Sequence, residues 1–207
     1  MNESADKHIK YSIDGKVFVI EINRPEKKNA LLPGMYAALA AGLHQANEDA
    51  SVNVALIRGA DDCFTSGNDV SSFLASNTST ADRPSVTFMN ALNESKKPIV
   101  AAISGLAIGI GTTLLFHCDL IYASENCFLQ LPFTRLGLCP EAGSSYLLPK
   151  QIGHVRASEL LLLGGRFSAA KAKEYGIINE VLPQGQYLVH AMEKARELAA
   201  LPADSVQ

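Results

Sequence analysis

Hydrophobic residues recur along this chain at two spacings, one typical of strands and one typical of helices. Residues 16–22 form a run rich in β-branched side chains, which predicts a buried strand. Met35, Leu39 and Leu43 follow one another at helical spacing and predict a helix over residues 35–47. By the same reasoning, further strands are predicted at residues 54–57, 99–103, 120–123, 128–131 and 179–182. Further helices are predicted at residues 86–94, 112–116, 144–150, 155–163, 169–175 and 187–201.

The order of these elements predicts the class of the fold. Strands alternate with helices, which implies crossover connections and a mostly parallel sheet, so we expect an α/β protein. Residues 73–84 are rich in Ser, Thr, Asn and Asp and are predicted to form a mobile connection. The length of 207 residues, 47% of them hydrophobic, favours one domain with a sizeable core.

Composition and charge exclude several classes of partner. The net charge of -3 carries no electrostatic signature of a nucleic-acid-binding protein. The four cysteines form no C-x-x-C pair, which argues against a metal site and for reduced thiols. The N-terminus is polar and no apolar run is long enough to span a bilayer. We therefore expect a cytoplasmic protein with no metal, no nucleic-acid partner and no membrane partner.

Two glycine-broken segments and one isolated carboxylate are the candidate chemistry. Residues 64–69 (FTSGND) and 105–111 (GLAIGIG) each follow a predicted strand. Glycine lets the backbone approach a ligand closely and point free N–H groups at it, and two such donors can form an oxyanion hole. Glu141, in the segment 138–143 (LCPEAG), could move a proton beside a bound carbonyl. The alternative for Glu141 is a side chain that caps the following helix.

A dinucleotide site is the other interpretation of the second segment. The full G-x-G-x-x-G pattern would need glycine where Leu114 stands, so this interpretation fails. Tight packing of a helix on a sheet remains an alternative explanation for a single glycine segment.

The order of the motifs resembles that of the crotonase superfamily of enoyl-CoA hydratases and isomerases. The matching segments run through most of the chain: 23–30 (NRPEKKNA), 64–69, 105–111, 118–119 (CD), 136–141 (LGLCPE), 164–165 (GG), 168–172 (SAAKA) and 176–181 (GIINEV). The resemblance implies a crotonase-like ββα spiral of two stacked sheets flanked by helices. It implies a single domain over 1–207, with a spiral core at about 8–183 and a shortened helical segment at 184–207. The substrate class would be acyl-CoA thioesters, so coenzyme A is part of the substrate and no separate cofactor is expected.

The resemblance also assigns roles to particular residues. The backbone N–H groups of Asn68 and Ile110 would form the oxyanion hole. The turn around Lys28 would lie against coenzyme A, although a solvated surface lysine explains that residue as well. The substrate-binding residues would be Lys28, Ala30, Leu31, Ser66, Gly67, Asp69, Val70, Phe73, Gly109, Phe133, Leu138 and Pro140.

The acid and base positions favour one reaction of the superfamily. Hydratases of this family use two glutamates, and the corresponding positions here are Thr113 and Phe133, neither of which exchanges protons near neutral pH. Glu141 remains, at the place of the single catalytic glutamate of the Δ3,Δ2-enoyl-CoA isomerase branch. Glu141 would remove a proton from C2 of a 3-enoyl thioester and return it to C4. Burial among Phe133, Leu138 and Pro140 would raise its pKa.

Two alternatives to isomerisation stay open. The chain could run another crotonase reaction, such as hydration or thioester hydrolysis, or it could bind acyl-CoA without turnover. The resemblance implies a homotrimer or a dimer of trimers. Relatives usually continue past the residue at which this sequence ends, so the C-terminus is either naturally short or truncated.

Overall fold

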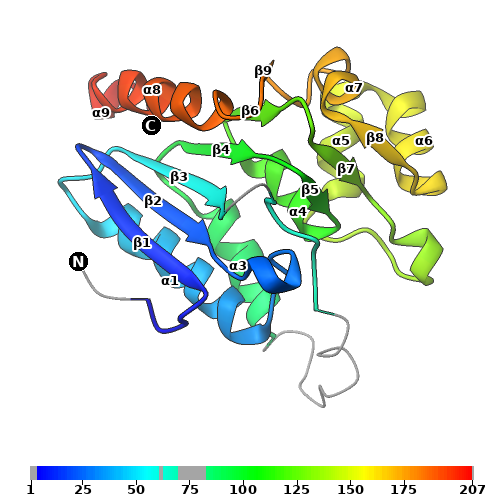
Figure 1. The fold of residues 1–207 in the computed structure, drawn as a ribbon, viewed down its shortest axis with the longest axis horizontal. Helices are drawn as coiled ribbons and strands as arrows, with labels where there is room; N and C mark the ends of the chain where they lie inside the picture. Colours follow the sequence, from blue (N-terminus) through cyan, green and yellow to red (C-terminus); the bar gives the residue numbers. More distant parts are fainter. Residues whose placement is uncertain (1–3, 61–62, 70–82, 207) are drawn as a thin grey trace.

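The structure, a computed structural model, describes residues 4–60, 63–69 and 83–206. Within these ranges a six-stranded sheet has the order β1-β2-β3-β4-β6-β9, and a three-stranded sheet has the order β5-β7-β8 (Figure 1). The strands of the larger sheet are β1 (Ile9–Asp14), β2 (Val17–Ile22), β3 (Val54–Gly59), β4 (Ile99–Ile103), β6 (Leu120–Ser124) and β9 (Glu180–Leu182). Adjacent strands in this sheet are parallel, except that β1 and β2 form an antiparallel pair.

The larger sheet is covered on both faces, which explains why its inner strands β2, β3, β4 and β6 are almost continuously apolar. In β2, Val17 and Val19 face α8 (Tyr187–Ala199), whereas Phe18 and Ile20 face α1 (Pro33–Glu48). Figure 1 shows α8 above the sheet, with α1 and α3 (Pro84–Asn93) below it. Side chains alternate between the faces of a strand, so the helices on each side bury every second residue.

The smaller sheet lies toward the end of the molecule away from β1 (Figure 1). Its strands are β5 (Leu106–Ile108), β7 (Phe128–Gln130) and β8 (Arg166–Ser168). The remaining helices are α4 (Ile110–Thr113), α5 (Ser144–Ile152), α6 (His154–Leu163), α7 (Ala169–Glu174) and α9 (Ala203–Val206), with short 3-10 turns η1 (Pro25–Lys27), η2 (Leu114–His117) and η3 (Thr134–Leu136). In the part of the chain described, no helix combines the length and apolar character that crossing a membrane requires.

The α/β class, the mostly parallel sheet and the two-sheet arrangement confirm the fold expected from the sequence. Three strands were not predicted: the six-residue β1 and the three-residue β5 and β8. The predicted helix at 112–116 is instead α4 followed by the 3-10 turn η2. Of the connection predicted at 73–84, only the last two residues are described, and Pro84 already begins α3.

The neighbouring strands β3 and β4 lead directly into the two glycine segments. Because the two strands are parallel, their carboxyl ends lie at the same edge of the sheet. The chain leaving β3 then pairs with the chain leaving β4: Phe64 N–H donates to Ser104 O at 2.8 Å, and Thr65 N–H donates to Leu106 O at 2.8 Å. The fold therefore brings residues 64–69 and 105–111 side by side.

Candidate active site

The turn that carries Lys28 is hydrogen-bonded to the segment that carries Asn68. Ser66 N–H donates to Lys28 O at 3.0 Å, and Leu31 N–H donates to Gly67 O at 2.8 Å. Asp69 N–H donates to Leu31 O at 3.0 Å. Two predicted parts of the site, the coenzyme A turn and the first oxyanion segment, are thus one structural unit.

Side chains lock this unit from inside. Asn29 is fully buried and its amide donates to Cys63 O at 2.6 Å, while Thr65 Oγ1 donates to Asn29 O at 2.6 Å. Arg24 Nη1 donates to Asp69 Oδ2 at 2.6 Å and to Ala30 O at 3.0 Å. The sequence gives no sign that Arg24 and Asp69 pair across 45 positions, so this contact was not predicted.

Gly67 closely approaches the second glycine segment, residues 105–111. A Cβ at Gly67, where φ is +89°, would lie 2.7 Å from Ile108 O. Only glycine fits both this backbone conformation and this spacing. Gly109, where φ is +58°, precedes the first residue of α4, Ile110. Asn68 directly follows Gly67, and Ile110 directly follows Gly109. The two residues therefore lie on two segments that are in contact with each other.

The N–H groups of Asn68 and Ile110 donate no hydrogen bond to any residue in the described ranges. Ile110 begins a helix, where an N–H has no partner within the helix. The carbonyl of the Gly67–Asn68 peptide accepts from Leu31 N–H, so the N–H at its other end points away from Leu31. The side chain of Asn68 is exposed, which leaves this part of the segment accessible to a ligand.

The carboxylate of Glu141 faces α4. Thr113 Oγ1, on the last residue of that helix, donates to Glu141 Oε1 at 2.5 Å. Burial raises the pKa of Glu141 to about 6, and the hydrogen bond from Thr113 acts in the opposite direction. A carboxyl group with a pKa near 6 can both accept and return a proton near neutral pH.

Glu141 does not cap the helix that follows it. The helix α5 begins at Ser144 and its N-cap is Gly143, with no side-chain cap hydrogen bond. The backbone carbonyl of Glu141 accepts from Ser144 Oγ at 2.7 Å and from Ser144 N–H at 3.0 Å. The helix-cap alternative is therefore wrong, because the side chain turns to Thr113 instead.

His117 and Ala142 hold the backbone beside this carboxylate. His117 Nε2 lies 2.8 Å from Ala142 O, and the ring nitrogen must be the donor because a carbonyl only accepts. Ala142 has φ of +50°, a conformation that non-glycine residues seldom adopt. This contact anchors the backbone of the loop that carries Glu141.

Tyr36 connects the two halves of the site. Its hydroxyl donates to Asn68 Oδ1. Burial raises the pKa of Tyr36 well above its ordinary value, and the nearby Glu141 carboxylate raises it further. The Tyr36 hydroxyl thus contacts Asn68 and lies within range of the Glu141 charge. Asn68 and Glu141 therefore lie on the same side of the molecule as this hydroxyl. From the sequence, residue 36 is predicted only as part of a helix.

Other predicted residues are placed less centrally. Phe133 is buried at 7% exposure, Pro140 is partly buried, and Leu138 is 45% exposed and cannot supply much of the apolar cover around Glu141. Lys28 is exposed, as a phosphate contact or a solvated lysine would be. Val70 and Phe73 lie outside the described residues.

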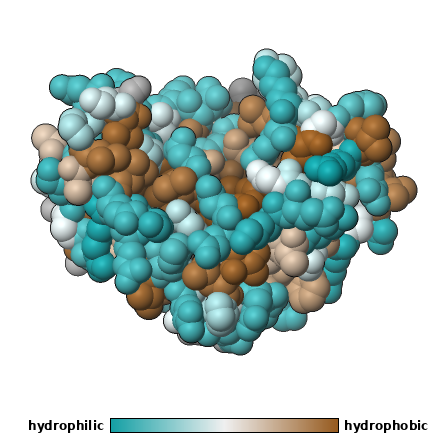
Figure 2. All heavy atoms as spheres, turned by 90° about the horizontal axis from the view of Figure 1, so that it is seen from above, coloured by the Kyte–Doolittle hydropathy of each residue, from teal (hydrophilic) through white to brown (hydrophobic). Residues whose placement is uncertain are grey.

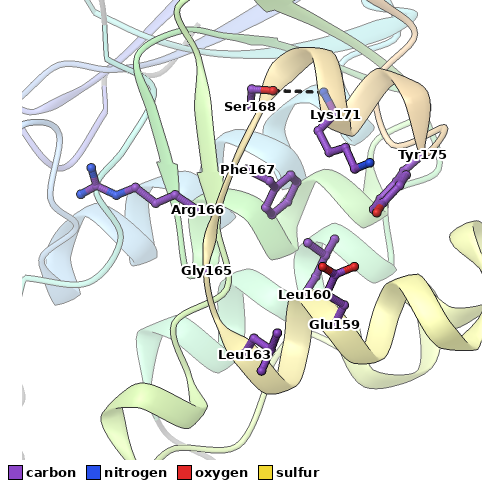
Figure 3. A pocket seen from close by; sticks show the side chains of 9 residues that line it. All are labelled: Glu159, Leu160, Leu163, Gly165, Arg166, Phe167, Ser168, Lys171 and Tyr175. Carbon is purple, nitrogen blue, oxygen red and sulfur yellow. Dashed lines mark hydrogen bonds between the residues drawn. The ribbon is translucent and has the colours of Figure 1, made fainter.

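A cavity of about 360 Å³ lies elsewhere, between α6, β8 and α7 (Figure 3). The residues that line it include Leu160, Phe167 and Tyr175, and none of them is a predicted site residue. In the described ranges no three His, Cys, Asp or Glu side chains gather as a metal site would need.

This chain is similar to known proteins in sequence and in structure. The profile of the enoyl-CoA hydratase/isomerase family matches residues 12–207. Enoyl-CoA delta isomerase 2 of Rattus norvegicus is 34% identical over 97% of this chain and 53% of its own length. Mitochondrial enoyl-CoA hydratase of Pongo abelii is 33% identical over 89% of this chain and 64% of its own length. The chain therefore spans about half the length of the isomerase relatives it matches.

A solved structure shows the same fold over nearly the whole chain. The structure of Pseudomonas aeruginosa OdaA superposes with a TM-score of 0.94 at 44% identity. The match covers 97% of this chain and 82% of that protein.

Proposed function

This chain belongs to the enoyl-CoA hydratase/isomerase family, and on that premise we propose that it isomerises 3-enoyl-CoA to 2-enoyl-CoA. One observation carries the proposal: the half-buried Glu141 carboxylate, with a pKa of about 6, accepts a hydrogen bond from Thr113 of α4, and the first N–H of that helix has no partner among the described residues. A proton carrier is thereby placed next to a candidate oxyanion donor.

The proposed reaction is a proton transfer within the substrate. The thioester oxygen accepts hydrogen bonds from the N–H groups of Asn68 and Ile110. Glu141 takes a proton from C2, the electron pair delocalises into a dienolate, and the negative charge rests on that oxygen. The same carboxyl group returns the proton to C4, which leaves the double bond in conjugation with the carbonyl. No atom is gained or lost and no electron leaves the substrate, so no separate cofactor is needed.

Hydration is the main competing reaction, since relatives named as hydratases also match. Adding water requires an acid and a base on the two reacting atoms. Thr113 uses its hydroxyl as a donor to Glu141, and Phe133 is apolar. The nearby carboxylate of Asp69 is held by Arg24 at 2.6 Å. Neither of the two positions that carry the glutamates of hydratases therefore holds a proton-exchanging group, which favours isomerisation.

The test is turnover of a 3-enoyl-CoA, followed by the ultraviolet absorbance of the conjugated thioester. We expect the wild-type protein to convert it and Glu141→Gln to lose activity by roughly 10²- to 10⁴-fold. Glu174→Gln is the matched control, because Glu174 is an exposed glutamate paired with Lys171 on α7. Conversion of a 2-enoyl-CoA to a 3-hydroxyacyl-CoA would instead support hydration. Binding of acyl-CoA without any turnover would indicate a binding protein.

Assembly into a homotrimer or a dimer of trimers stays a prediction. Large apolar side chains are exposed on α6, at Val155, Leu162 and Leu163. Leu201, which follows α8, is also exposed. Figure 2 shows hydrophobic patches separated by hydrophilic side chains on the upper face of the molecule. Exposed apolar surface of this kind is compatible with subunit contacts, and light scattering would give the mass of the assembly.

A further inference from the structure

A buried tyrosine on α1 reaches the segment that carries the first proposed oxyanion donor. Tyr36 is 3% exposed, and its ring packs against Phe88 of α3 with centroids 5.9 Å apart. Its hydroxyl donates to Oδ1 of Asn68, a residue whose own surface is exposed. A buried scaffold residue therefore holds a side chain that a ligand can reach.

We propose that Tyr36 is a positioning residue of the oxyanion hole: its hydroxyl fixes Asn68, and with it the peptide whose N–H faces the thioester oxygen. This inference rests on the function proposed above. It adds a residue that neither touches the reacting carbons nor exchanges a proton with them.

The peptide between Gly67 and Asn68 is held from two sides. Its carbonyl accepts from Leu31 N–H at 2.8 Å, which fixes one end of the peptide plane. Beyond the N–H, the Asn68 side chain is tied to Tyr36 on a rigid helix of 16 residues. An oxyanion donor works best when its direction is set before the charge develops, because no energy is then spent on reorganisation. Loss of the second anchor leaves the N–H present but less well directed.

The phenol is suited to remain a donor while Glu141 is charged. Tyr36 is surrounded by the apolar core, and the Glu141 carboxylate opposes a second negative charge beside it. Asn68 Oδ1 consequently receives a hydrogen bond from a neutral O–H near neutral pH, where the base is ionised. Among the described residues, the amide N–H₂ of Asn68 donates to no partner.

The first experiment compares Tyr36→Phe with the wild-type protein on a 3-enoyl-CoA. We expect kcat to fall by roughly tenfold, the upper range for one lost hydrogen bond, while KM changes little. Tyr11→Phe is the matched control. Tyr11 also packs near α1 and its hydroxyl donates to Ala38 O, so its removal costs the same kind of bond without touching Asn68. An equal loss of kcat in both variants would overturn the proposal.

A double-variant cycle asks whether Tyr36 acts through Asn68. Asn68→Ala keeps the backbone N–H and removes the side chain that Tyr36 holds. If Tyr36 acts through that side chain, Tyr36→Phe should lower kcat little further in an Asn68→Ala background. Fully additive losses would show that Tyr36 acts by another route and would overturn the proposal.

A readout that needs no turnover separates this proposal from the proposed function. Acetoacetyl-CoA forms an enolate whose ultraviolet absorbance reports charge on the thioester oxygen. We expect the wild-type protein to bind the enolate and Tyr36→Phe to bind it roughly tenfold more weakly. A wild-type protein that binds the enolate but isomerises no 3-enoyl-CoA overturns the function alone. Equal binding by both proteins overturns the role of Tyr36, and no binding by the wild-type protein overturns both.

Discussion

The hydroxyl of Thr113 donates a 2.5 Å hydrogen bond to the carboxylate of Glu141. Thr113 is fully buried and is the last residue of α4. The N–H of Ile110, the first residue of that helix, has no partner within the described structure. One short helix thus ties the proposed base to a proposed oxyanion donor. The sequence comparison with hydratases marks position 113 as a missing glutamate, whereas the structure shows a residue that supports the remaining one.

Thr113→Val should raise the pKa of Glu141, because the variant removes the hydrogen bond that stabilises the ionised form. The rise of kcat/KM with pH should then move to higher pH. Thr112→Val is the matched control, since Thr112 is also buried on α4 but donates to Ala107 O instead. An unchanged pH profile in Thr113→Val would show that this hydrogen bond does not tune the base.

Glu141 should make the folded protein less stable as pH rises. Its folded pKa of about 6 lies above the ordinary value of 4.5, so the folded state binds the proton more tightly than the unfolded state. As the pH rises from about 4.5 to about 6, the free energy of unfolding therefore decreases, by about 2 kcal/mol in total. Glu141→Gln lacks this charge, so at pH 8 it should be more stable than the wild-type protein, with a Tm about 4–8 °C higher.

Urea unfolding of both proteins from pH 4 to pH 8 measures this difference. The two stabilities should converge at the acid end, where Glu141 is protonated in the folded and the unfolded state alike. A variant that is less stable than the wild-type protein at pH 8 would contradict the prediction, because it would mean that the charged carboxylate is well accommodated.

The long elements of the fold were predictable because their hydrophobic spacing is sustained. The strand at residues 16–22 and the helix at 35–47 appear as β2 and α1 with shifts of one or two residues. The strand β8, Arg166–Ser168, was missed because only one of its three residues is apolar, whereas the equally short β7 and β9 each hold two. The strand β5 was missed because it lies inside the segment 105–111, where the glycines suggested a loop.

The candidate site divides in a similar way. Glu141, Gly67 and Gly109 were found because a lone carboxylate and glycine turns are visible as local patterns. Tyr36 and Arg24 were not, because their importance comes from contacts with residues 32 and 45 positions away. A tyrosine at helical spacing is ordinarily a core residue, and the contact with Asn68 appears only when α1 has been packed against the loop after β3.

The Arg24–Asp69 ion pair should contribute to stability, because both side chains are largely buried, at 12% and 15% exposure. Asp69→Asn should lower the free energy of unfolding by about 2–3 kcal/mol, since a buried charge then loses its partner. Arg24→Met combined with Asp69→Leu should be less harmful than the sum of the single variants, which urea unfolding can measure. Additive losses would show that the two side chains are not energetically coupled.

Gly67→Ala should damage the site more than it damages the fold. A Cβ at this position would lie 2.7 Å from Ile108 O, and φ of +89° disfavours any other residue. The backbone must then move at the peptide that presents the N–H of Asn68. Misdirecting one oxyanion donor typically costs on the order of a hundredfold in kcat, so isomerase turnover is the measurement.

Two further glycines separate the causes of that loss. Gly15→Ala carries a positive φ of +59° with nothing within 4 Å, so it reports backbone strain without a collision. Gly165→Ala also has nothing within 4 Å and lines the distant cavity, so it reports the added methyl group alone. We expect both to keep kcat near the wild-type value, although Gly15→Ala loses some stability. If Gly67→Ala keeps kcat as they do, the close approach of residues 67 and 108 does not shape the oxyanion hole.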